Sequence, residues 1–199
     1  MDGSSKKRRA SPEPEEDPNA KILLMEQGIL ESKKNYNDIT LLLKAAQDYE
    51  NGEPESMLST VALCRIFVRL LAQGSLVKKK SLSEKELTVV AWLKEQYSQF
   101  KALLLELLDQ EEIATTALTL CMRVLKAEGG HMYTKEEFTF PKAFLEQIVS
   151  RLLLSDNDDL RQAFIEEFAE QYDDIRFYTF KAIKYEILRS SLFHSFVIY

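Results

Sequence analysis

The sequence predicts an all-α protein of about eight helices, stacked as antiparallel pairs in a HEAT-like or irregular α-solenoid. No stretch shows the sustained apolar–polar alternation of a β-strand, whereas apolar residues recur three and four positions apart along most of the chain. Every glycine and proline beyond the N-terminal tail, except Gly28, stands at the expected end of a helix. The pairs have irregular spacing and little mutual identity, so a single irregular bundle is the alternative to stacked repeats.

The composition is typical of a globular protein, with 45% hydrophobic and 29% charged residues in 199. The net charge of −6 argues against nucleic-acid binding over the whole surface. Cys64 and Cys121 lie in apolar helical runs, where a free thiol acts as a small hydrophobe, so we expect a reducing compartment. The N-terminus lacks an apolar signal-peptide segment and no 18-residue apolar stretch occurs, so we expect neither secretion by the usual route nor membrane insertion.

Residues 1–19 form a polar, proline-containing tail that we expect to be disordered. The tail carries four adjacent cations, Lys6, Lys7, Arg8 and Arg9. Such a cluster suits the acidic groove of an import receptor and is a candidate nuclear localisation signal. A solvated run of charge is the alternative interpretation.

The helical domain is expected to span residues 20–189, beginning with helices at 20–31, at 38–51 and from Pro54 to Gly74. Gly52 is placed to end the second helix, and Pro54 suits the first turn of the third. Arg65 and Arg69 lie one turn apart beside the apolar stripe of the third helix. They are candidates for RNA or partner contact, with a solvated face as the alternative.

The chain is organised around a long helix from Ser83 to Leu108, which Ser83 and Glu86 open with a capping box. Apolar residues at positions 90, 93, 97, 100, 104 and 107 form one stripe. Further leucines lie outside the stripe, so the helix should be covered on more than one side. Lys78, Lys79 and Lys80 precede it in a loop; they could contact RNA phosphate or simply be solvated.

The second half of the chain contains four further helices. They are expected at residues 111–127, from Pro141, at 159–172 and at 173–189. Gly129 and Gly130 should stop the first of them, and Asp156-Asn157-Asp158 should form a turn that caps the third. Residues 190–199 end on apolar side chains without a polar cap, so we expect the chain to be the front part of a longer protein.

Acidic residues are concentrated between Asp156 and Arg176, where eight acids accompany two bases. The net charge of this segment, −6, therefore equals the net charge of the whole chain. Such a field would repel RNA and attract a basic protein segment, unless it serves only solubility.

Residues suited to catalysis or to metal binding are scarce. Neither His131 nor His194 has a cysteine or carboxylate at ligand spacing on one helix face, and no glycine-rich loop follows a strand. Cys121 lies in an apolar row that disfavours its thiolate. We therefore expect a protein without catalytic residues, metal or cofactor.

Several segments resemble the nucleolar complex protein 4 family. Residues 172–181 (YDDIRFYTFK) are similar to an aspartate-x-arginine-aromatic-aromatic signature, matched by Asp174 and Arg176. Ala62–Phe67, the segment around Gly74, and Trp92-Leu93 with the following tyrosine also resemble that family, in matching order over residues 35–185. The C-terminal CCAAT-binding-factor portion of the family is absent from this sequence.

The resemblance implies an α-helical repeat protein of the nucleus and nucleolus that assembles with a nucleolar protein 14-like partner on the pre-ribosomal particle. It would be a non-catalytic scaffold in small-subunit maturation, rRNA processing and export. Asp174 and Arg176 are then candidate partner contacts. A cytoplasmic helical adaptor and an RNA-binding helical module are the alternatives.

Overall fold

The computed structural model describes residues 17–51, 54–132 and 140–196, and within them the protein is entirely helical. This confirms the predicted fold class. The eight α-helices of these ranges are α1 (Pro18–Glu31), α2 (Asp38–Gln47), α3 (Pro54–Ala72), α4 (Glu84–Leu107), α5 (Ala114–His131), α6 (Lys142–Leu154), α7 (Asp158–Phe164) and α8 (Asp173–Phe196).

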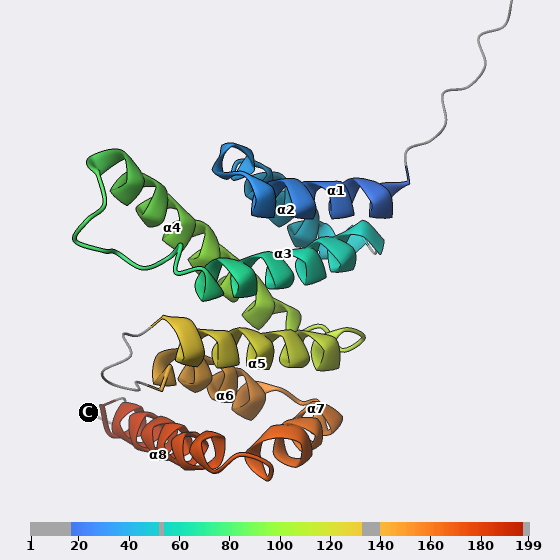
Figure 1. The fold of residues 1–199 in the computed structure, drawn as a ribbon. Coiled ribbons are helices and arrows are strands. Elements are labelled where there is room, and N and C mark those ends of the chain that lie inside the picture. The colour runs from blue at the N-terminus through green and yellow to red at the C-terminus, as the bar shows by residue number, and fades with distance from the viewer. Residues whose placement is uncertain (1–16, 52–53, 133–139, 197–199) are drawn as a thin grey trace, which may run out of the picture.

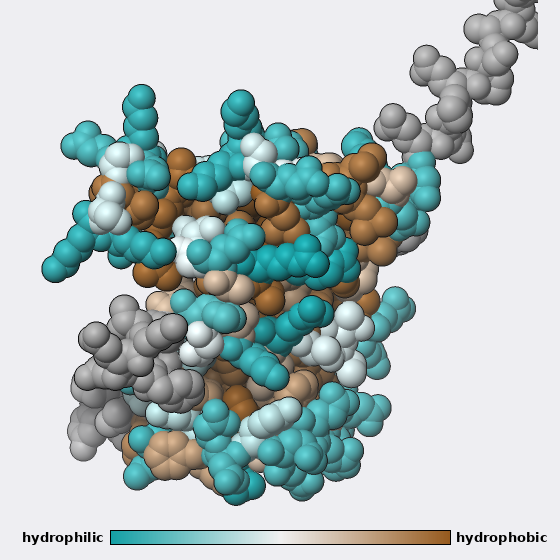
Figure 2. Space-filling model, viewed as in Figure 1, coloured by the Kyte–Doolittle hydropathy of each residue, from teal (hydrophilic) through white to brown (hydrophobic). Residues whose placement is uncertain are grey.

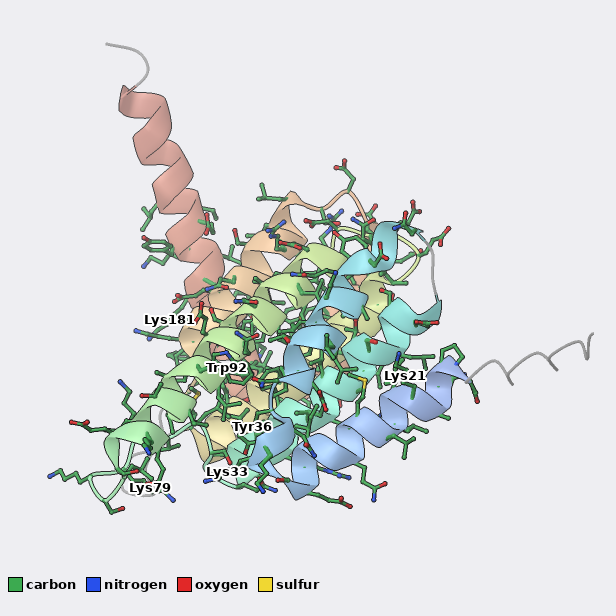
Figure 3. All side chains as sticks on the ribbon, turned by 90° about the horizontal axis from the view of Figure 1, so that it is seen from above. Lys21, Lys33, Tyr36, Lys79, Trp92 and Lys181 are labelled. Atoms are coloured by element: carbon green, nitrogen blue, oxygen red, sulfur yellow. The ribbon has the colours of Figure 1, made fainter. Side chains whose placement is uncertain are left out.

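The helices are stacked in successive layers, as in a solenoid (Figure 1). Helices α1 and α2 lie on one side of α3, α5 lies on the other side, and α6 and α8 follow beyond α5. Helix α4 crosses this stack obliquely and contacts α2, α5 and α6. The C-terminal part of α8 stands clear of the other helices (Figure 3).

One hydrophobic core runs from α1 to α8. Phe67 of α3 packs its ring against Tyr97 and Phe100 of α4, with ring centroids 5.2 and 5.4 Å apart. Leu103 and Leu105 are buried together with the main stripe of α4, so this helix is covered on more than one side, as predicted. None of the helices in the described ranges is long and apolar enough to cross a membrane.

The helix ends follow local sequence signals at most positions. The Ser83 backbone N–H donates to Glu86 Oε2 at 2.9 Å, and Ser83 Oγ accepts from the Glu86 N–H at 3.4 Å, which completes the predicted capping box. Gly74 has a φ of 70° just after α3, a conformation that favours glycine. Asn157 caps α7 by accepting from the Leu160 N–H at 2.9 Å.

The expected helix stop at Gly129 and Gly130 is wrong. Helix α5 passes through both glycines to His131, neither glycine has a positive φ, and the Met132 N–H donates to the Glu128 carbonyl at 2.9 Å. A Cβ on Gly129 would lie 3.4 Å from Pro141 Cδ. The small residue therefore lets the start of α6 pack closely, which is a tertiary reason for a glycine inside a helix.

Other helix bounds also differ from expectation. Helix α5 begins at Ala114, three residues later than predicted, and α8 continues to Phe196 beyond the expected end near Arg189. The predicted seventh helix is split into α7 and a π-helical segment, Ile165–Ala169, in which the Glu170 N–H donates to the Ile165 carbonyl at 2.9 Å. Most of residues 131–140, expected to form a loop, lie outside the described residues.

Candidate protein-docking surface

The segment that resembles the family signature forms the start of α8 and fastens this helix to its neighbours. Ile175 is buried, and the Tyr178 ring stacks on Phe140 with centroids 4.1 Å apart and planes 8° apart. Phe140 immediately precedes the N-terminal end of α6. One face of α8 is therefore occupied by packing inside the protein.

The two charged residues of the signature make local contacts. Arg176 forms an ion pair with Asp173, one helical turn earlier, and the Asp174 carboxylate accepts from the Ile175 N–H at 2.8 Å. Asp174 also lines an apolar cavity of about 570 Å³ between α5 and the start of α8. Contact of either residue with a partner stays a prediction.

A neighbouring face of α8 lines an apolar groove of about 400 Å³ together with α6 and α7, which we call the α6–α8 groove. Its apolar lining consists of Val149, Leu152, Leu153, Phe164, Ile165, Ala169, Phe180 and Ile183. Three of these large side chains, Leu153, Ile165 and Phe180, are exposed, and Phe180 retains 67% of its accessible surface. A continuous exposed apolar patch of this kind is typical of an interaction site.

The π-helical segment helps to shape the groove. Ile165 lines the α6–α8 groove, whereas Phe168, three positions later, lines the cavity next to α5. In an α-helix, residues three apart share one face, so the wider turn directs these two side chains to different sides. This segment could not be predicted from the apolar spacing, which is compatible with an ordinary helix.

An acidic hollow of about 650 Å³ adjoins the groove at the turn between α6 and α7. Five carboxylates line it, from Asp109, Glu111, Asp156, Asp158 and Asp159. Leu154 also lines the hollow and is 80% exposed, directly beside Leu153 of the groove. Figure 2 shows hydrophilic side chains gathered over α7.

The arginines around these two concavities are engaged inside the protein. Arg151 pairs with Asp109, and Arg161 pairs with Asp158. The remaining carboxylates of the hollow form no ion pair with any residue that the structure describes. The surface therefore combines an apolar trough with an excess of negative charge at one end.

Thr179 supplies one further feature of the groove. Its Oγ1 is buried and has no hydrogen-bond partner among the described residues, although threonine in a helix often bonds to the preceding turn. An unsatisfied buried hydroxyl costs about 1–3 kcal/mol. A polar group on a ligand in the groove could satisfy it.

The basic residues that the sequence singled out are distributed elsewhere. Lys78, Lys79 and Lys80 are exposed in the loop before α4, and Arg69 is exposed on α3. Arg65 is half-buried and binds Glu26 of α1, so the alternative of a solvated face does not hold for this arginine. Lys6 to Arg9 and the His194 side chain lie outside the described residues.

The cysteines and the potential metal ligands form no cluster suited to a metal ion in the described part of the chain. Cys64 and Cys121 are buried and free, as predicted. Burial raises the pKa of the Cys64 thiol to about 11 and raises the pKa of the Cys121 thiol further. The described residues contain no group of three or more histidine, cysteine or carboxylate side chains that could hold a metal ion.

Comparison with known proteins identifies the family. Residues 11–192 match the family described as nucleolar complex protein 4-like, TPR repeats. The chain belongs to this family. The match covers most of the chain, including all eight α-helices in whole or in large part, and agrees with the stacked helix pairs of the structure.

Two relatives of this nucleolar complex protein 4-like chain come from Schizosaccharomyces pombe and Xenopus laevis. It is 29% identical over 177 residues to an uncharacterized protein of Schizosaccharomyces pombe, covering 86% of this chain and 36% of that protein. It is 30% identical over 95 residues to nucleolar complex protein 4 homolog A of Xenopus laevis, covering 44% of this chain and 18% of that protein. The chain thus spans about a third or less of the length of these relatives.

Proposed function

We propose that the chain is a non-catalytic scaffold of the nucleolus that takes part in biogenesis of the small ribosomal subunit by docking a protein partner in the α6–α8 groove. Membership of the nucleolar complex protein 4-like family supports the nucleolar role. The exposed apolar groove supports the docking mechanism.

The proposed occupant is an amphipathic helix whose apolar face is followed by basic residues. An apolar trough accepts the apolar stripe of a helix, as in helix-in-groove recognition. The acidic hollow beside Leu154 would attract basic residues at one end of that helix and fix its direction. A nucleolar protein 14-like partner, implied by the sequence resemblance, is the first candidate to supply it.

The test is co-purification of the full chain with the nucleolar protein 14-like protein, using Phe180→Asp as the groove variant. Phe180 is 67% exposed, so an aspartate there should not disturb folding. The matched control is Leu24→Asp, because Leu24 on α1 is 69% exposed and lies far from the groove. We expect at least tenfold weaker capture for the groove variant and unchanged capture for the control.

Equal capture by Phe180→Asp and the wild type would overturn docking through the groove. Fluorescence imaging of the tagged full chain tests the nucleolar role separately. We expect nucleolar enrichment, with loss of nuclear signal when Lys6, Lys7, Arg8 and Arg9 are changed to alanine. An evenly cytoplasmic wild-type chain would contradict the nucleolar role.

A further inference from the structure

Three lysines from separate segments line one hollow beside the N-terminal end of α4. Lys33 lies in the short 3-10 turn after α1, Lys79 lies in the loop before α4, and Lys85 lies in the first turn of α4. Figure 3 shows Lys33 and Lys79 at one corner of the molecule, away from Lys21 and Lys181. The fold therefore joins a lysine pair near residue 33 to the loop lysines, which are more than 40 residues further along the chain.

The hollow has a volume of about 450 Å³ and a largely apolar floor. Val77, Leu82, Val89, Val90 and Leu93 form most of this floor. Lys79 folds back over the turn at Gly74, because its Nζ lies only 3.7 Å from the place where a Cβ on Gly74 would be. The cations thus form a rim around an apolar depression instead of a flat field of charge.

The lysines of this corner are available to a ligand. Lys33, Lys79 and Lys85, with their neighbours Lys34, Lys78 and Lys80, are exposed and form no ion pair with a described residue. The one acidic residue that the structure places in the lining is Glu86, whose carboxylate already accepts from the Ser83 N–H and Oγ. Residues 31–38 and 73–90 together carry six lysines and four acids, a positive excess in an acidic chain.

We propose that this lysine-rimmed hollow binds the phosphate backbone of RNA. Lysine is a flexible point charge, suited to phosphates without reading bases, so affinity should depend on salt more than on sequence. A nucleotide offers a phosphate for the rim and a flat base for the apolar floor, whereas a purely acidic peptide such as polyglutamate offers only carboxylates. The acidic residues of α7 and of the π-helical segment Ile165–Ala169 lie at the other end of the stack and would keep RNA from the groove.

The experiment measures binding of the full chain to a fluorescent 20-nucleotide RNA by anisotropy over a range of salt concentrations. The variant changes Lys33, Lys79 and Lys85 to glutamine. The matched control changes three exposed lysines on other helices, Lys21, Lys142 and Lys184, and so removes the same charge. Polyglutamate of similar length serves as the competitor, and thermal unfolding confirms that each variant is folded.

We expect the hollow variant to bind at least tenfold more weakly than the wild type, and the control variant to bind within about twofold of it. Three lost phosphate contacts should reduce the slope of log affinity against log salt by about 2. Three outcomes would overturn the proposal: no binding of RNA by the wild type, equal loss in both variants, or displacement of RNA by equimolar polyglutamate. Wild-type affinity in the hollow variant, which binding through the basic N-terminal tail alone would produce, would overturn the proposal as well.

Discussion

Arg65 holds Glu26 across the interface of α3 and α1. Its Nε lies 2.9 Å from Oε1 and 3.0 Å from Oε2 of a carboxylate that is 7% exposed, although the residues are 39 positions apart. The hydrogen bond to Glu26 raises the pKa of the Arg65 guanidinium, so this side chain remains charged. This pair fastens the first helix of the stack to the central one.

Arg65→Ala should destabilise the protein by about 2–3 kcal/mol, because it leaves the Glu26 carboxylate buried without its partner. Arg69→Ala is the control: this exposed arginine lies one turn later on α3 and should cost less than about 0.5 kcal/mol. Urea unfolding monitored by circular dichroism measures both. Similar costs for the two variants would contradict the structural role assigned to Arg65.

Lys101 and Glu128 should show energetic coupling. Lys101 Nζ lies 2.7 Å from the buried Glu128 carboxylate and within 5.0 Å of the Tyr97 and Phe144 ring centroids, so it links α4, α5 and α6. Lys101→Met should cost about 2–4 kcal/mol, and adding Glu128→Gln should recover part of this loss. A double-mutant cycle in urea should give about 1–3 kcal/mol of coupling; simple additivity would argue against the pair.

Replacing single glycines by alanine tests whether α5 is continuous through Gly129 and Gly130 and whether Gly74 needs its positive φ. Gly130→Ala should stabilise the protein by about 0.5–1 kcal/mol, because nothing lies within 4 Å of its new Cβ and alanine favours a helix. Gly129→Ala should gain less, since its Cβ would meet Pro141 Cδ at 3.4 Å. Gly74→Ala should instead destabilise by about 1–2 kcal/mol, because φ is 70° there. Thermal melts of the three variants should follow this order; a loss in Gly130→Ala would indicate that α5 ends earlier.

The capping box predicts a pH dependence of stability. The Ser83 backbone N–H lowers the pKa of Glu86, so the carboxylate stabilises the fold above its unfolded pKa, and this contribution disappears as the pH falls through the folded pKa. Glu86→Gln keeps a hydrogen-bond acceptor but does not titrate. The stability difference between the wild type and this variant should be largest at neutral pH and should shrink as the pH falls through the folded pKa of Glu86. A difference that does not change with pH would rule out the ionised cap.

The two thiols should report on opening of the core. Burial raises the pKa of Cys64 to about 11 and that of Cys121 further, so few thiolates exist at neutral pH and none faces solvent. Ellman's reagent should modify neither thiol at about pH 8 until denaturant unfolds the chain. Fast labelling of the native protein would mean that the α3–α5 interface opens readily.

The sequence by itself determined the helical class, most helix positions, the capping box, the burial of both cysteines and the family. The structural features in this set depend on residues within a few positions of one another, because apolar spacing and caps act over one or two turns. The stop predicted at the glycine pair of α5 was wrong, because the local signal says nothing about tertiary packing: the helix continues through both residues, and Gly129 lies against Pro141.

Only the tertiary structure decided which side chains meet. Arg65 reaches Glu26 over 39 residues, Lys101 reaches Glu128 over 27, and the α6–α8 groove and the lysine-rimmed hollow each collect residues from at least three segments. The sequence shows that α8 has many apolar residues. It does not show which of them pack inside the protein and which line the α6–α8 groove. Periodicity gives the direction of a side chain relative to its own helix, whereas the neighbour it meets depends on how the helices stack.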